Sequence, residues 1–425
     1  MRTRPVYISG GIRTPFVKSM TTYKDVTSAD LMISTLKTLV QRYKLEGQIL
    51  GDVGCGAVMQ SSADWNFTRE CVLSSGLHPH TPGYNVQRAC GTSLELSSQM
   101  ALKIAAHQMD IAIAGGVDTN SDLPIMVSKS LSHKLMDLNA AKDGLDKAKI
   151  LATLRPSDLK PQLPAVVEPR TKMSMGEHTE KMVQEWKISR EAQDELALIS
   201  HQNATRAYEN GFYKDLVFEY HGLDRDGIIR PDTSMEKLAK LKPAFEKSDK
   251  GTLTAGNSSP LTDGASAVII TSEEAATEYN LPLWARFIDC QVSAVNYVAG
   301  EGLLMAPTIA VSELLKRNNL SFDDFDFFEI HEAFAGQVLC TLKAWESDEY
   351  CKKVLGRTEA MGPLDRSKMN INGGSVALGH PFGATGARMV ASLGKMLYQR
   401  GGRGRGLISI CTAGGMGVAA ILESV

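Results

Sequence analysis

Two cysteines and two histidines lie where predicted strands give way to glycine-rich or helical sequence, and these residues could do chemistry. Cys90 stands in QRACGTSLEL, between a predicted strand at 83–87 and a predicted helix at 92–108. At a helix start, unpaired backbone N–H groups and the helix dipole stabilise a thiolate, which lowers the thiol pKa and predicts a nucleophile. The alternative is a buried structural cysteine that fills a small hole beside a tight turn.

A histidine in the second half of the chain could serve such a thiol as a base. His380 lies in NINGGSVALGHPFGATGARMV, in a glycine-dense loop before a helix predicted to begin near Thr385. A histidine held by rigid turns can take a proton from a thiol, whereas the alternative is a loop histidine that caps backbone groups. The glycines have neither the G-x-x-x-x-G-K-[ST] nor the G-x-G-x-x-G spacing, which argues against a nucleotide-binding loop here.

Two further segments carry the second cysteine and the second histidine. Cys411 ends a predicted strand in ICTAGGMG, where nearly bare backbone lets a substrate approach and lets N–H groups face a developing oxyanion. A hairpin turn with a structural cysteine is the alternative. His331 and Glu332 follow a strand in FFEIHEAFAGQ, without the H-E-x-x-H spacing of a zinc protease. Phe334, in the same segment, is either a core residue or a pocket wall.

The elements around these residues predict an α/β fold. Strands at 4–10, 83–87 and 110–118 alternate with helices at 31–40 and 92–108. Strand, helix and strand in succession predict a parallel sheet that is covered on both faces.

The middle of the chain has a different texture. From about Ser121, short helical pieces are broken by prolines at 124, 156, 161, 164 and 169 and are followed by a charged helix, which indicates an inserted region. Regular α/β sequence resumes at 251–272, and a second unit runs from about Leu283 to two strands around a glycine-rich turn at 404–424. Because both units have a glycine-rich strand-to-helix turn, a diverged duplication is a reasonable hypothesis.

Composition excludes several classes of protein. A chain of 425 residues predicts two or three structural units, and 43% hydrophobic with 22% charged residues is typical of a globular protein. The net charge of −2 argues against nucleic-acid binding. No uncharged apolar stretch reaches the ~20 residues of a membrane-spanning helix, and no apolar signal core follows the first residues. Seven scattered cysteines without a C-x-x-C pair indicate a reducing compartment rather than a disulfide framework or a zinc site. We therefore expect an intracellular, cytoplasmic protein.

Taken together, the motifs resemble those of the thiolase family, whose members cleave or form 3-oxoacyl thioesters of coenzyme A. The resemblance covers nearly the whole chain and rests on motifs in the family's order: RTPF, CGTSLE, AGGVD, MSMGEHTE, TAGNSSPLTDGA, HEAFA, GGSVALGHPFGATGAR and CTAGGMG. It implies two βαβαβαββ halves in five layers, α-β-α-β-α, with an inserted loop domain. The expected division is an N-terminal half at 1–120 and 250–280, a loop domain at 121–249 and a C-terminal half at 281–425.

The resemblance also implies roles for individual residues. Cys90 matches the nucleophile that is acylated, and His380 matches the histidine that activates it and lines the oxyanion hole. Cys411 matches the second cysteine, which protonates the leaving acetyl-CoA carbanion and then deprotonates the incoming coenzyme A. The backbone N–H groups of Cys90 and Ala413 match the oxyanion donors, each worth ~3 kcal/mol in other enzymes.

Further positions are expected to contact the substrate. Ser258 and Ser259 align with the region that touches the pantetheine arm of coenzyme A, and Met175 and Phe334 are further candidates for substrate contact. Coenzyme A is implied as a substrate, and neither a metal nor another cofactor is required.

Two departures from the family pattern carry information. Many thiolases read N-E-A-F where this chain has His331, so an imidazole replaces the asparagine that holds a catalytic water. The H-E-A-F form resembles the branch that works with a hydratase/dehydrogenase partner in fatty-acid oxidation. Ala413 stands where many relatives have glycine.

The resulting prediction is a 3-ketoacyl-CoA thiolase of fatty-acid β-oxidation that acts through a Cys90 acyl-enzyme. One alternative is an acetyl-CoA acetyltransferase restricted to four carbons, and another is a non-catalytic lipid- or partner-binding relative. A decarboxylating ketoacyl synthase would have a second histidine in place of Cys411, and a thiol–disulfide redox role is disfavoured. The family implies dimers or dimers of dimers, with a hydratase/dehydrogenase α subunit as an expected partner and peripheral membrane contact as a weaker hypothesis.

Overall fold

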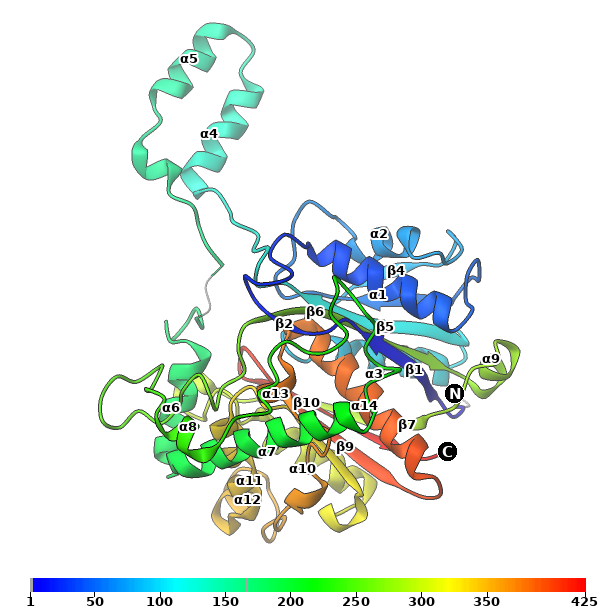
Figure 1. The fold of residues 1–425 in the computed structure, drawn as a ribbon. Helices are drawn as coiled ribbons and strands as arrows, with labels where there is room; N and C mark the ends of the chain where they lie inside the picture. Colours follow the sequence, from blue (N-terminus) through cyan, green and yellow to red (C-terminus); the bar gives the residue numbers. More distant parts are fainter. Residues whose placement is uncertain (1–2, 165–166) are drawn as a thin grey trace.

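A computed structural model describes residues 3–164 and 167–425 of the chain. Residues 1–2 of the expected N-terminal half and 165–166 of the expected insertion lie outside the described residues. The described strands form one continuous hydrogen-bonded sheet that consists of two similar halves. Figure 1 shows these halves one above the other, with helices around and between them.

The first half of the sheet has the strand order β4-β3-β5-β6-β1. β3 is parallel to both β4 and β5, whereas β6 runs antiparallel between β5 and β1. The strands of this half are β1 (Tyr7–Arg13), β2 (Val17–Lys18), β3 (Asp52–Cys55), β4 (Gly83–Asn85), β5 (Ile111–Asp118) and β6 (Thr262–Thr271).

The second half has the order β8-β9-β10-β7, with β8 parallel to β9 and β10 antiparallel between β9 and β7. Its strands are β7 (Ala285–Ala294), β8 (Phe327–Ile330), β9 (Arg405–Thr412) and β10 (Met416–Glu423). In the described part of the chain, β1 of the first half pairs with β7 of the second through Tyr7 with Arg286 and Ile8 with Ala285, and Phe287 also donates to the Val6 carbonyl.

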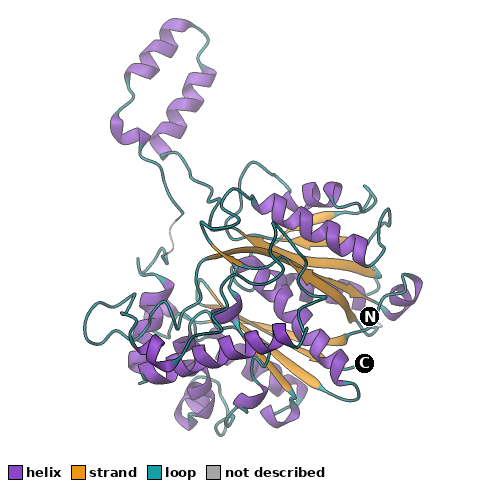
Figure 2. Cartoon of the chain, in the orientation of Figure 1, coloured by secondary structure: helices purple, strands orange, loops and turns teal. Residues whose placement is uncertain are grey.

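The helices complete five layers, as the resemblance implied. α1 and α2 cover the outer face of the first half, and α10 and α11 cover the outer face of the second. α3 and α14 lie in the middle layer, where they contact each other and strands of both halves (Figure 2). These helices are α1 (Ser28–Arg42), α2 (Phe67–Ser74), α3 (Thr92–Ala105), α10 (Ala306–Asn318), α11 (Ala335–Glu346) and α14 (Thr385–Arg400).

The two halves repeat the same order of elements, which supports a diverged duplication. The first half runs β1-α1-β3-α2-β4-α3-β5-β6, and the second runs β7-α10-β8-α11, then α14-β9-β10. The second half has a single bridge, Phe328 to Met369, at the position of β4. A short 3₁₀ turn at Arg366–Lys368 precedes Met369, and Asn370 has a left-handed φ of 47°. Because extended backbone cannot continue through either feature, this strand shrinks to one residue.

Local sequence explains where the central elements begin and end. The helix predicted near Thr385 begins at that residue. The helix predicted at 92–108 ends earlier, at Ala105, because His107 adopts a left-handed φ of 57°. In α1, the Thr27 side chain accepts the N–H of Asp30 and the Asp30 carboxylate accepts the N–H of Thr27, which fixes the helix start.

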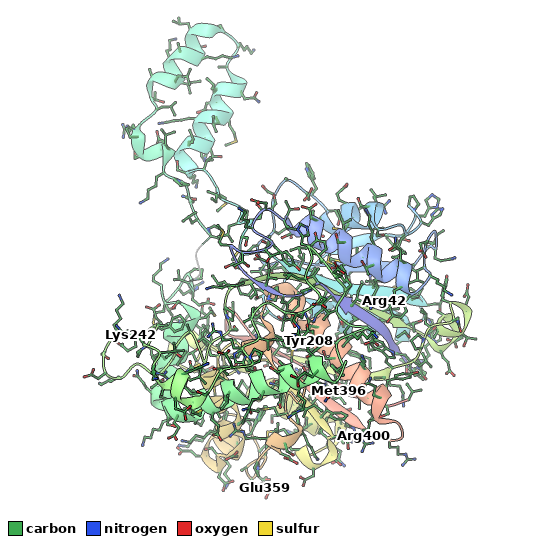
Figure 3. All side chains as sticks on the ribbon, in the orientation of Figure 1. Arg42, Tyr208, Lys242, Glu359, Met396 and Arg400 are labelled. Carbon is green, nitrogen blue, oxygen red and sulfur yellow. The ribbon has the colours of Figure 1, made fainter. Side chains whose placement is uncertain are left out.

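The expected insertion contains an arm that stands away from the body. α4 (Lys129–Ala140) and α5 (Gly144–Ala152) pack against each other, and neither has a buried residue. Figure 1 shows the pair at the top of the view, clear of both sheet halves, and Figure 3 shows their side chains projecting around them. Within residues 3–164 and 167–425, no helix is both long and apolar enough to cross a bilayer.

The rest of the expected insertion packs on the body. α6 (Met175–Glu185) contacts α11, and α7 (Arg190–Glu209) contacts α8 (Met235–Ala239), α11 and α13. The shorter helices elsewhere are α9 (Glu273–Glu278), α12 (Asp348–Lys353) and α13 (Ser375–Leu378). The division into domains at 121, 250 and 281 stays a prediction.

A buried ion pair ties this region to the first half. Both terminal nitrogens of Arg13, at the end of β1, bind the carboxylate of Asp226 at 2.5 and 2.6 Å. The same carboxylate accepts the N–H of Phe16 and the hydroxyl of Tyr208, which is labelled in Figure 3. Arg13 and Asp226 are both buried, so removing either partner would leave an uncompensated buried charge and destabilise the fold.

Candidate active site

The duplicated fold brings Cys90 and His380 together. Cys90 precedes α3, and His380 lies just before α14, at the corresponding turn of the second half. The distance from Cys90 Sγ to His380 Nε2 is 3.2 Å. Ala89, directly before the cysteine, has a left-handed φ of 43°, a costly backbone conformation for a non-glycine residue. This backbone turn presents the thiol to the histidine.

The opposite nitrogen of His380 fixes the ring. His380 Nδ1 lies 2.6 Å from the hydroxyl of Thr385, and that hydroxyl donates to the carbonyl of Pro381 at 3.3 Å. Because the Thr385 proton is used in this way, its oxygen accepts the N–H of Nδ1. Nε2 therefore carries the lone pair that faces the Cys90 thiol.

A close approach of α3 and α14 sets the geometry of this pair. A Cβ added to Gly386 would lie 2.3 Å from the backbone nitrogen of Leu94, so only glycine fits there. The hydroxyl of Ser93 donates to the carbonyl of Gly383 at 2.6 Å and accepts the N–H of Ala387 at 2.8 Å. The two helix starts are thereby locked together beside the reactive groups.

Asp118, at the end of β5, hydrogen bonds to the turn that follows His380. Its carboxylate accepts the backbone N–H groups of Val58, Met59 and Gly383. Burial raises the pKa of Asp118 to about 6, although these three donors oppose the shift.

Burial reverses the expected pKa shift of Cys90. The helix start predicts a lowered thiol pKa, but burial raises the pKa of Cys90 to about 12. The backbone N–H groups of Ala413 and of Cys90 itself hydrogen bond to the sulfur and act in the expected direction, without overcoming desolvation. Burial, followed by the charge of Arg388, lowers the pKa of His380 to about 3. At neutral pH the resting pair is a thiol beside a neutral imidazole.

The second cysteine, Cys411, lies beside this pair at the end of β9. Its thiol is buried and donates to the side-chain oxygen of Gln337 at 3.4 Å. Burial and then the proximity of Cys90 raise the pKa of Cys411 well above its ordinary value. Gly414 and Gly415, in the turn that follows, have φ values of 77° and 73°, which only glycine adopts readily. Gln337 was not singled out from the sequence, because a lone glutamine in a helix gives no chemical signal.

His331 completes the cluster. The ring centroids of His331 and His380 lie 4.1 Å apart, and one nitrogen of each ring and Cys90 Sγ all lie within 4.8 Å of one another. His331 is fully buried, and burial lowers its pKa well below the usual range, so the ring is neutral. Its Nδ1 lies 2.9 Å from the hydroxyl of Ser375, and its Nε2 has no hydrogen-bond partner in the described part of the chain.

A buried polar chain extends from His331 that sequence reasoning did not find. Arg388 donates to the Ser375 hydroxyl at 3.3 Å and lies 3.6 Å from the carboxylate of Glu329. Burial raises the pKa of Glu329 to about 7. Ser375 and Arg388 stand in the same glycine-rich motif as His380, but their residue types are common on protein surfaces and gave no sign of burial.

Glu332, the neighbour of His331, turns away from the cluster. Its carboxylate accepts from the Ser200 hydroxyl at 2.7 Å and from the Asn370 amide at 2.6 Å. It also accepts the N–H of Val376 at 3.2 Å. These contacts give Glu332 a structural role, because they brace the segment that leads to His380.

The candidate substrate-contact residues lie in, or next to, the apolar cluster that contains Cys411. Ser258 pairs with Phe334 in an isolated antiparallel bridge, and both the N–H and the hydroxyl of Ser259 donate to the Ala333 carbonyl. Phe334 and Cys411 belong to one apolar cluster, against which Met175 packs. Ser258 is buried, and its hydroxyl has no hydrogen-bond partner among the described residues.

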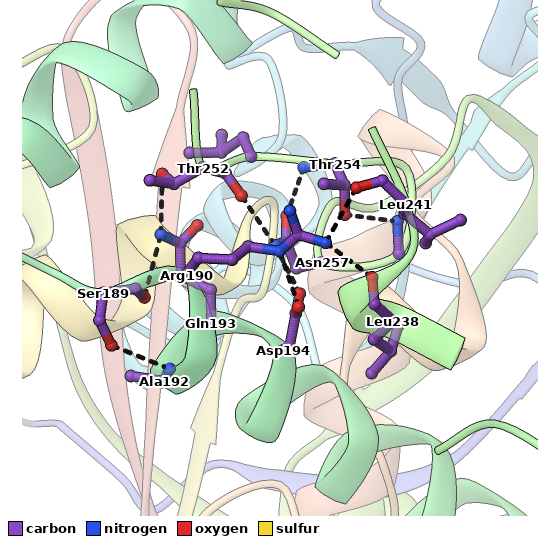
Figure 4. Close-up of polar contacts among 12 residues, drawn as sticks. Ser189, Arg190, Ala192, Gln193, Asp194, Leu238, Leu241, Thr252, Thr254 and Asn257 are labelled. Carbon is purple, nitrogen blue, oxygen red and sulfur yellow. Dashed lines mark hydrogen bonds and ion pairs between the residues drawn. The ribbon is translucent and has the colours of Figure 1, made fainter. Parts of the chain in front are cut away.

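A network drawn in Figure 4 positions the loop that carries the two serines. The Asn257 amide donates to Asp194 at 2.8 Å and to the Thr252 carbonyl at 3.2 Å, and its oxygen accepts the N–H of Thr254. Asp194 is held in turn by Arg190 at 2.7 Å. The loop is thus fixed on α7, with Ser258 directly after its anchor.

Comparisons with known proteins agree over the full length. A family model described as the thiolase N-terminal domain matches residues 6–274, and one described as the thiolase C-terminal domain matches 281–424. Proteins named 3-ketoacyl-CoA thiolase from Yersinia pestis (strain Pestoides F) and Yersinia pseudotuberculosis (strain YPIII) are each 41% identical over 424 residues, covering 98% of this chain and 96% of each relative.

Solved structures are similar across the same range. The acetyl-CoA acetyltransferase of Bacillus anthracis has a TM-score of 0.82 at 31% identity and covers 100% of both chains. The human mitochondrial 3-ketoacyl-CoA thiolase in complex with CoA has a TM-score of 0.81 at 29% identity, covering 99% of this chain and 98% of the other.

Proposed function

Because the chain belongs to the thiolase family, we propose that it is a 3-ketoacyl-CoA thiolase, an acyltransferase of fatty-acid β-oxidation. It cleaves a 3-oxoacyl-CoA with coenzyme A into acetyl-CoA and a shortened acyl-CoA. The observation that carries the proposal is the 3.2 Å contact between Cys90 Sγ and His380 Nε2, with Cys411 beside it.

The first half of the proposed reaction acylates Cys90. His380 Nε2 takes the thiol proton as the sulfur attacks the 3-oxo carbon, and the backbone N–H groups of Cys90 and Ala413 stabilise the oxyanion. The bond between the second and third carbons then breaks and leaves the acyl group on sulfur. Cys411 gives its proton to the acetyl-CoA carbanion, and acetyl-CoA departs.

The second half regenerates the site. The Cys411 thiolate takes the thiol proton of coenzyme A, and the coenzyme sulfur attacks the acyl group on Cys90. The Cys90 sulfur leaves and recovers its proton from His380, so both cysteines and the histidine return to their starting states. The raised pKa values of Cys90 and Cys411 support this scheme, because two neutral thiols hold the protons that the two steps need.

His331 is proposed to hold a substrate oxygen or a water, in place of the asparagine of many relatives. A neutral histidine donates through Nε2 when Nδ1 accepts the Ser375 hydroxyl, and Arg388 donates to that same hydroxyl oxygen. This tautomer leaves the free Nε2–H directed at the reacting groups.

Four residues are proposed to hold the rest of the substrate. The unpartnered Ser258 hydroxyl and the neighbouring Ser259 would face the pantetheine arm of coenzyme A. Met175 and Phe334 would contact the acyl chain, which is consistent with their place in the apolar cluster that contains Cys411.

A length series separates this function from its nearest rival. The similarity to an acetyl-CoA acetyltransferase makes a four-carbon specialist the second candidate. We would measure coenzyme A-dependent cleavage of 3-oxoacyl-CoA substrates from four to sixteen carbons, with Cys90→Ser in parallel. We expect cleavage of long substrates and an inactive variant. Cleavage of acetoacetyl-CoA alone would identify the acetyltransferase, and no acylation of Cys90 by any substrate would identify a binding protein.

The arm is proposed as a docking element for a partner subunit. Several large apolar side chains on it are exposed: Leu135, Met136, Leu145, Leu151 and Leu154. A hydratase/dehydrogenase α subunit or a second copy of the chain fits this surface better than a lipid, because lysines and aspartates interrupt it. Analytical ultracentrifugation of the chain alone and with such a subunit tests this. Loss of assembly on replacing Leu135 and Leu145 with serine supports it, whereas co-sedimentation with anionic vesicles alone would favour membrane contact.

We also propose a cytoplasmic location. All seven cysteines are unpaired, which is usual in a reducing compartment, and bacterial relatives share the full length. Cell fractionation tests the proposal, and recovery of the protein in the periplasm would overturn it.

A further inference from the structure

Cys90, His331 and His380 together have the composition of a soft-metal site. One nitrogen from each ring and the sulfur lie within 4.8 Å of one another, and the sulfur is 3.2 Å from His380 Nε2. A tetrahedral Zn²⁺ with Zn–S of about 2.3 Å and Zn–N of about 2.0 Å holds its ligand atoms about 3.3 to 3.6 Å apart. The sulfur and His380 Nε2 already have nearly this spacing, and since the other atoms lie within 4.8 Å, His331 must move inward by at most about 1.5 Å.

The surroundings of the two rings also suit a metal. A histidine that binds metal through one nitrogen usually rests its other nitrogen on an oxygen, which fixes the ring. Here Nδ1 of His380 contacts the hydroxyl of Thr385, and Nδ1 of His331 contacts that of Ser375. Both hydroxyl oxygens can accept an Nδ1–H, which places each lone pair on Nε2.

One atom in the cluster lacks any partner. The Nε2 of His331 is buried and has no hydrogen bond within residues 3–164 and 167–425, whereas buried polar atoms are nearly always paired. His380 presents its lone pair on Nε2, and His331 can do the same once its ring proton moves to Nδ1, where the Ser375 hydroxyl oxygen can accept it. The cluster therefore offers two imidazole nitrogens and one sulfur as ligands.

We propose that Cys90, His331 and His380 bind a borderline-soft divalent cation such as Zn²⁺ in the substrate-free protein. Binding forms bonds from the metal to sulfur and to two Nε2 atoms and releases the thiol proton to solvent. His331 switches tautomer, so that its Nδ1–H donates to Ser375. The cation occupies the nucleophile and is an inhibitor, not a cofactor of the reaction.

Because His331 supplies one of the three ligands, the metal site should exist only in thiolases with histidine at this position. With asparagine at that position, as in many relatives, only one thiol and one imidazole would remain, and a carboxamide is a poor ligand for Zn²⁺. Metal binding is measured without substrate and is therefore independent of acyl transfer.

Cobalt provides a direct readout of the ligands. The full-length protein is titrated with CoCl₂ under reducing, metal-free conditions, and the sulfur-to-cobalt charge-transfer absorption in the near ultraviolet is followed, with ZnCl₂ as competitor and EDTA to reverse binding. We expect one Co²⁺ and one released proton per chain. Cys90→Ser should abolish the charge-transfer absorption, and His331→Asn should weaken Co²⁺ binding at least tenfold. Cys290→Ser, which changes another partly exposed thiol, is the matched control and should leave binding unchanged.

Each contrary result is informative. Binding that survives Cys90→Ser, that is lost in Cys290→Ser or that is unchanged in His331→Asn would overturn the proposal, as would no charge-transfer absorption at millimolar Co²⁺. Circular dichroism of each variant separates loss of the site from loss of fold. Cleavage activity measured in EDTA tests the thiolase function separately, so either proposal can fail alone.

Discussion

Replacing Gly386 with alanine should slow catalysis without changing any group that touches substrate. Gly386 lies in the first turn of α14, where the new Cβ would be 2.3 Å from the backbone nitrogen of Leu94. Non-bonded heavy atoms need about 3.5 Å, so α3 and α14 must separate by about 1 Å. The Leu94 nitrogen is a backbone atom and the new Cβ is bonded directly to the backbone, so neither atom can move away by a side-chain rotation.

The separation is transmitted to the reacting atoms. Cys90 and His380 lie at the starts of these two helices, 3.2 Å apart, so a shift of about 1 Å lengthens their contact beyond hydrogen-bonding reach. Misplacement of this size costs on the order of 100-fold in rate, or about 2.7 kcal/mol. Overpacking costs a further 1 to 3 kcal/mol, roughly, of folding stability.

The same helix provides a matched control. A Cβ added to Gly394 would meet Ile8 at 3.4 Å and Trp284 at 3.7 Å, which are ordinary contacts. Gly394→Ala should therefore keep wild-type activity and raise stability slightly, because alanine favours the helix by up to about 1 kcal/mol.

Three quantities are measured for the wild type, Gly386→Ala and Gly394→Ala. They are kcat/KM for cleavage of a 3-oxoacyl-CoA, the rate of Cys90 acylation in rapid-quench experiments, and Tm. If Gly386→Ala does not fold, Ser93→Ala loosens the same contact without adding atoms and should lower the acylation rate about tenfold. The reasoning is refuted if a folded Gly386→Ala protein acylates Cys90 within threefold of the wild-type rate.

Three further predictions concern ionisation, buried charge and the orientation of His331. Because burial raises the thiol pKa of Cys90 to about 12, alkylation of Cys90 by iodoacetamide should accelerate about tenfold per pH unit from pH 7 to 10. Mass spectrometry distinguishes alkylation of Cys90 from that of the other thiols. A rate that reaches a plateau near pH 7 would indicate a thiolate–imidazolium pair instead. Asp226→Asn leaves Arg13 buried and unpaired and should lower the free energy of unfolding by about 3 to 5 kcal/mol in urea titrations, whereas a loss below 1 kcal/mol would mean that the pair is solvated. Ser375→Ala removes the hydroxyl that orients His331 and should lower kcat about tenfold with little change in Tm. Adding His331→Asn to this variant should cause no further loss of kcat. Fully additive losses would show that Ser375 acts elsewhere.

The order of elements could be predicted from local sequence, whereas the meeting of distant residues could not. Alternating strands and helices, and the helix start at Thr385, follow from periodicity and turn residues. By contrast, the approach of Cys90 to His380 spans 290 positions and was expected only through the family motifs. The single-residue strand at Met369 was missed because a 3₁₀ turn at Arg366–Lys368 and the left-handed residue Asn370 limit it from both sides.

Burial explains the errors within the site. The helix-start argument gave the wrong sign for the Cys90 pKa because it counts local dipoles and omits the desolvation imposed by the second half of the chain. Gln337, Ser375 and Arg388 escaped notice for the same reason, since their importance depends on what surrounds them in three dimensions.

The paired arrangement of the two repeats has a consequence for how the enzyme responds to perturbation. The nucleophile and the base lie on opposite sides of a seam, where two paired positions of β1 and β7 and the Phe287 N–H to Val6 carbonyl bond join the described sheet halves. Further contacts across the seam include the packing of α3 against α14 and the hydrogen bond from the Gly383 N–H to Asp118. Neither repeat alone holds both Cys90 and His380, so the reactivity of the thiol depends on the contacts between the repeats. A change that slightly separates the repeats should therefore abolish activity before the protein unfolds.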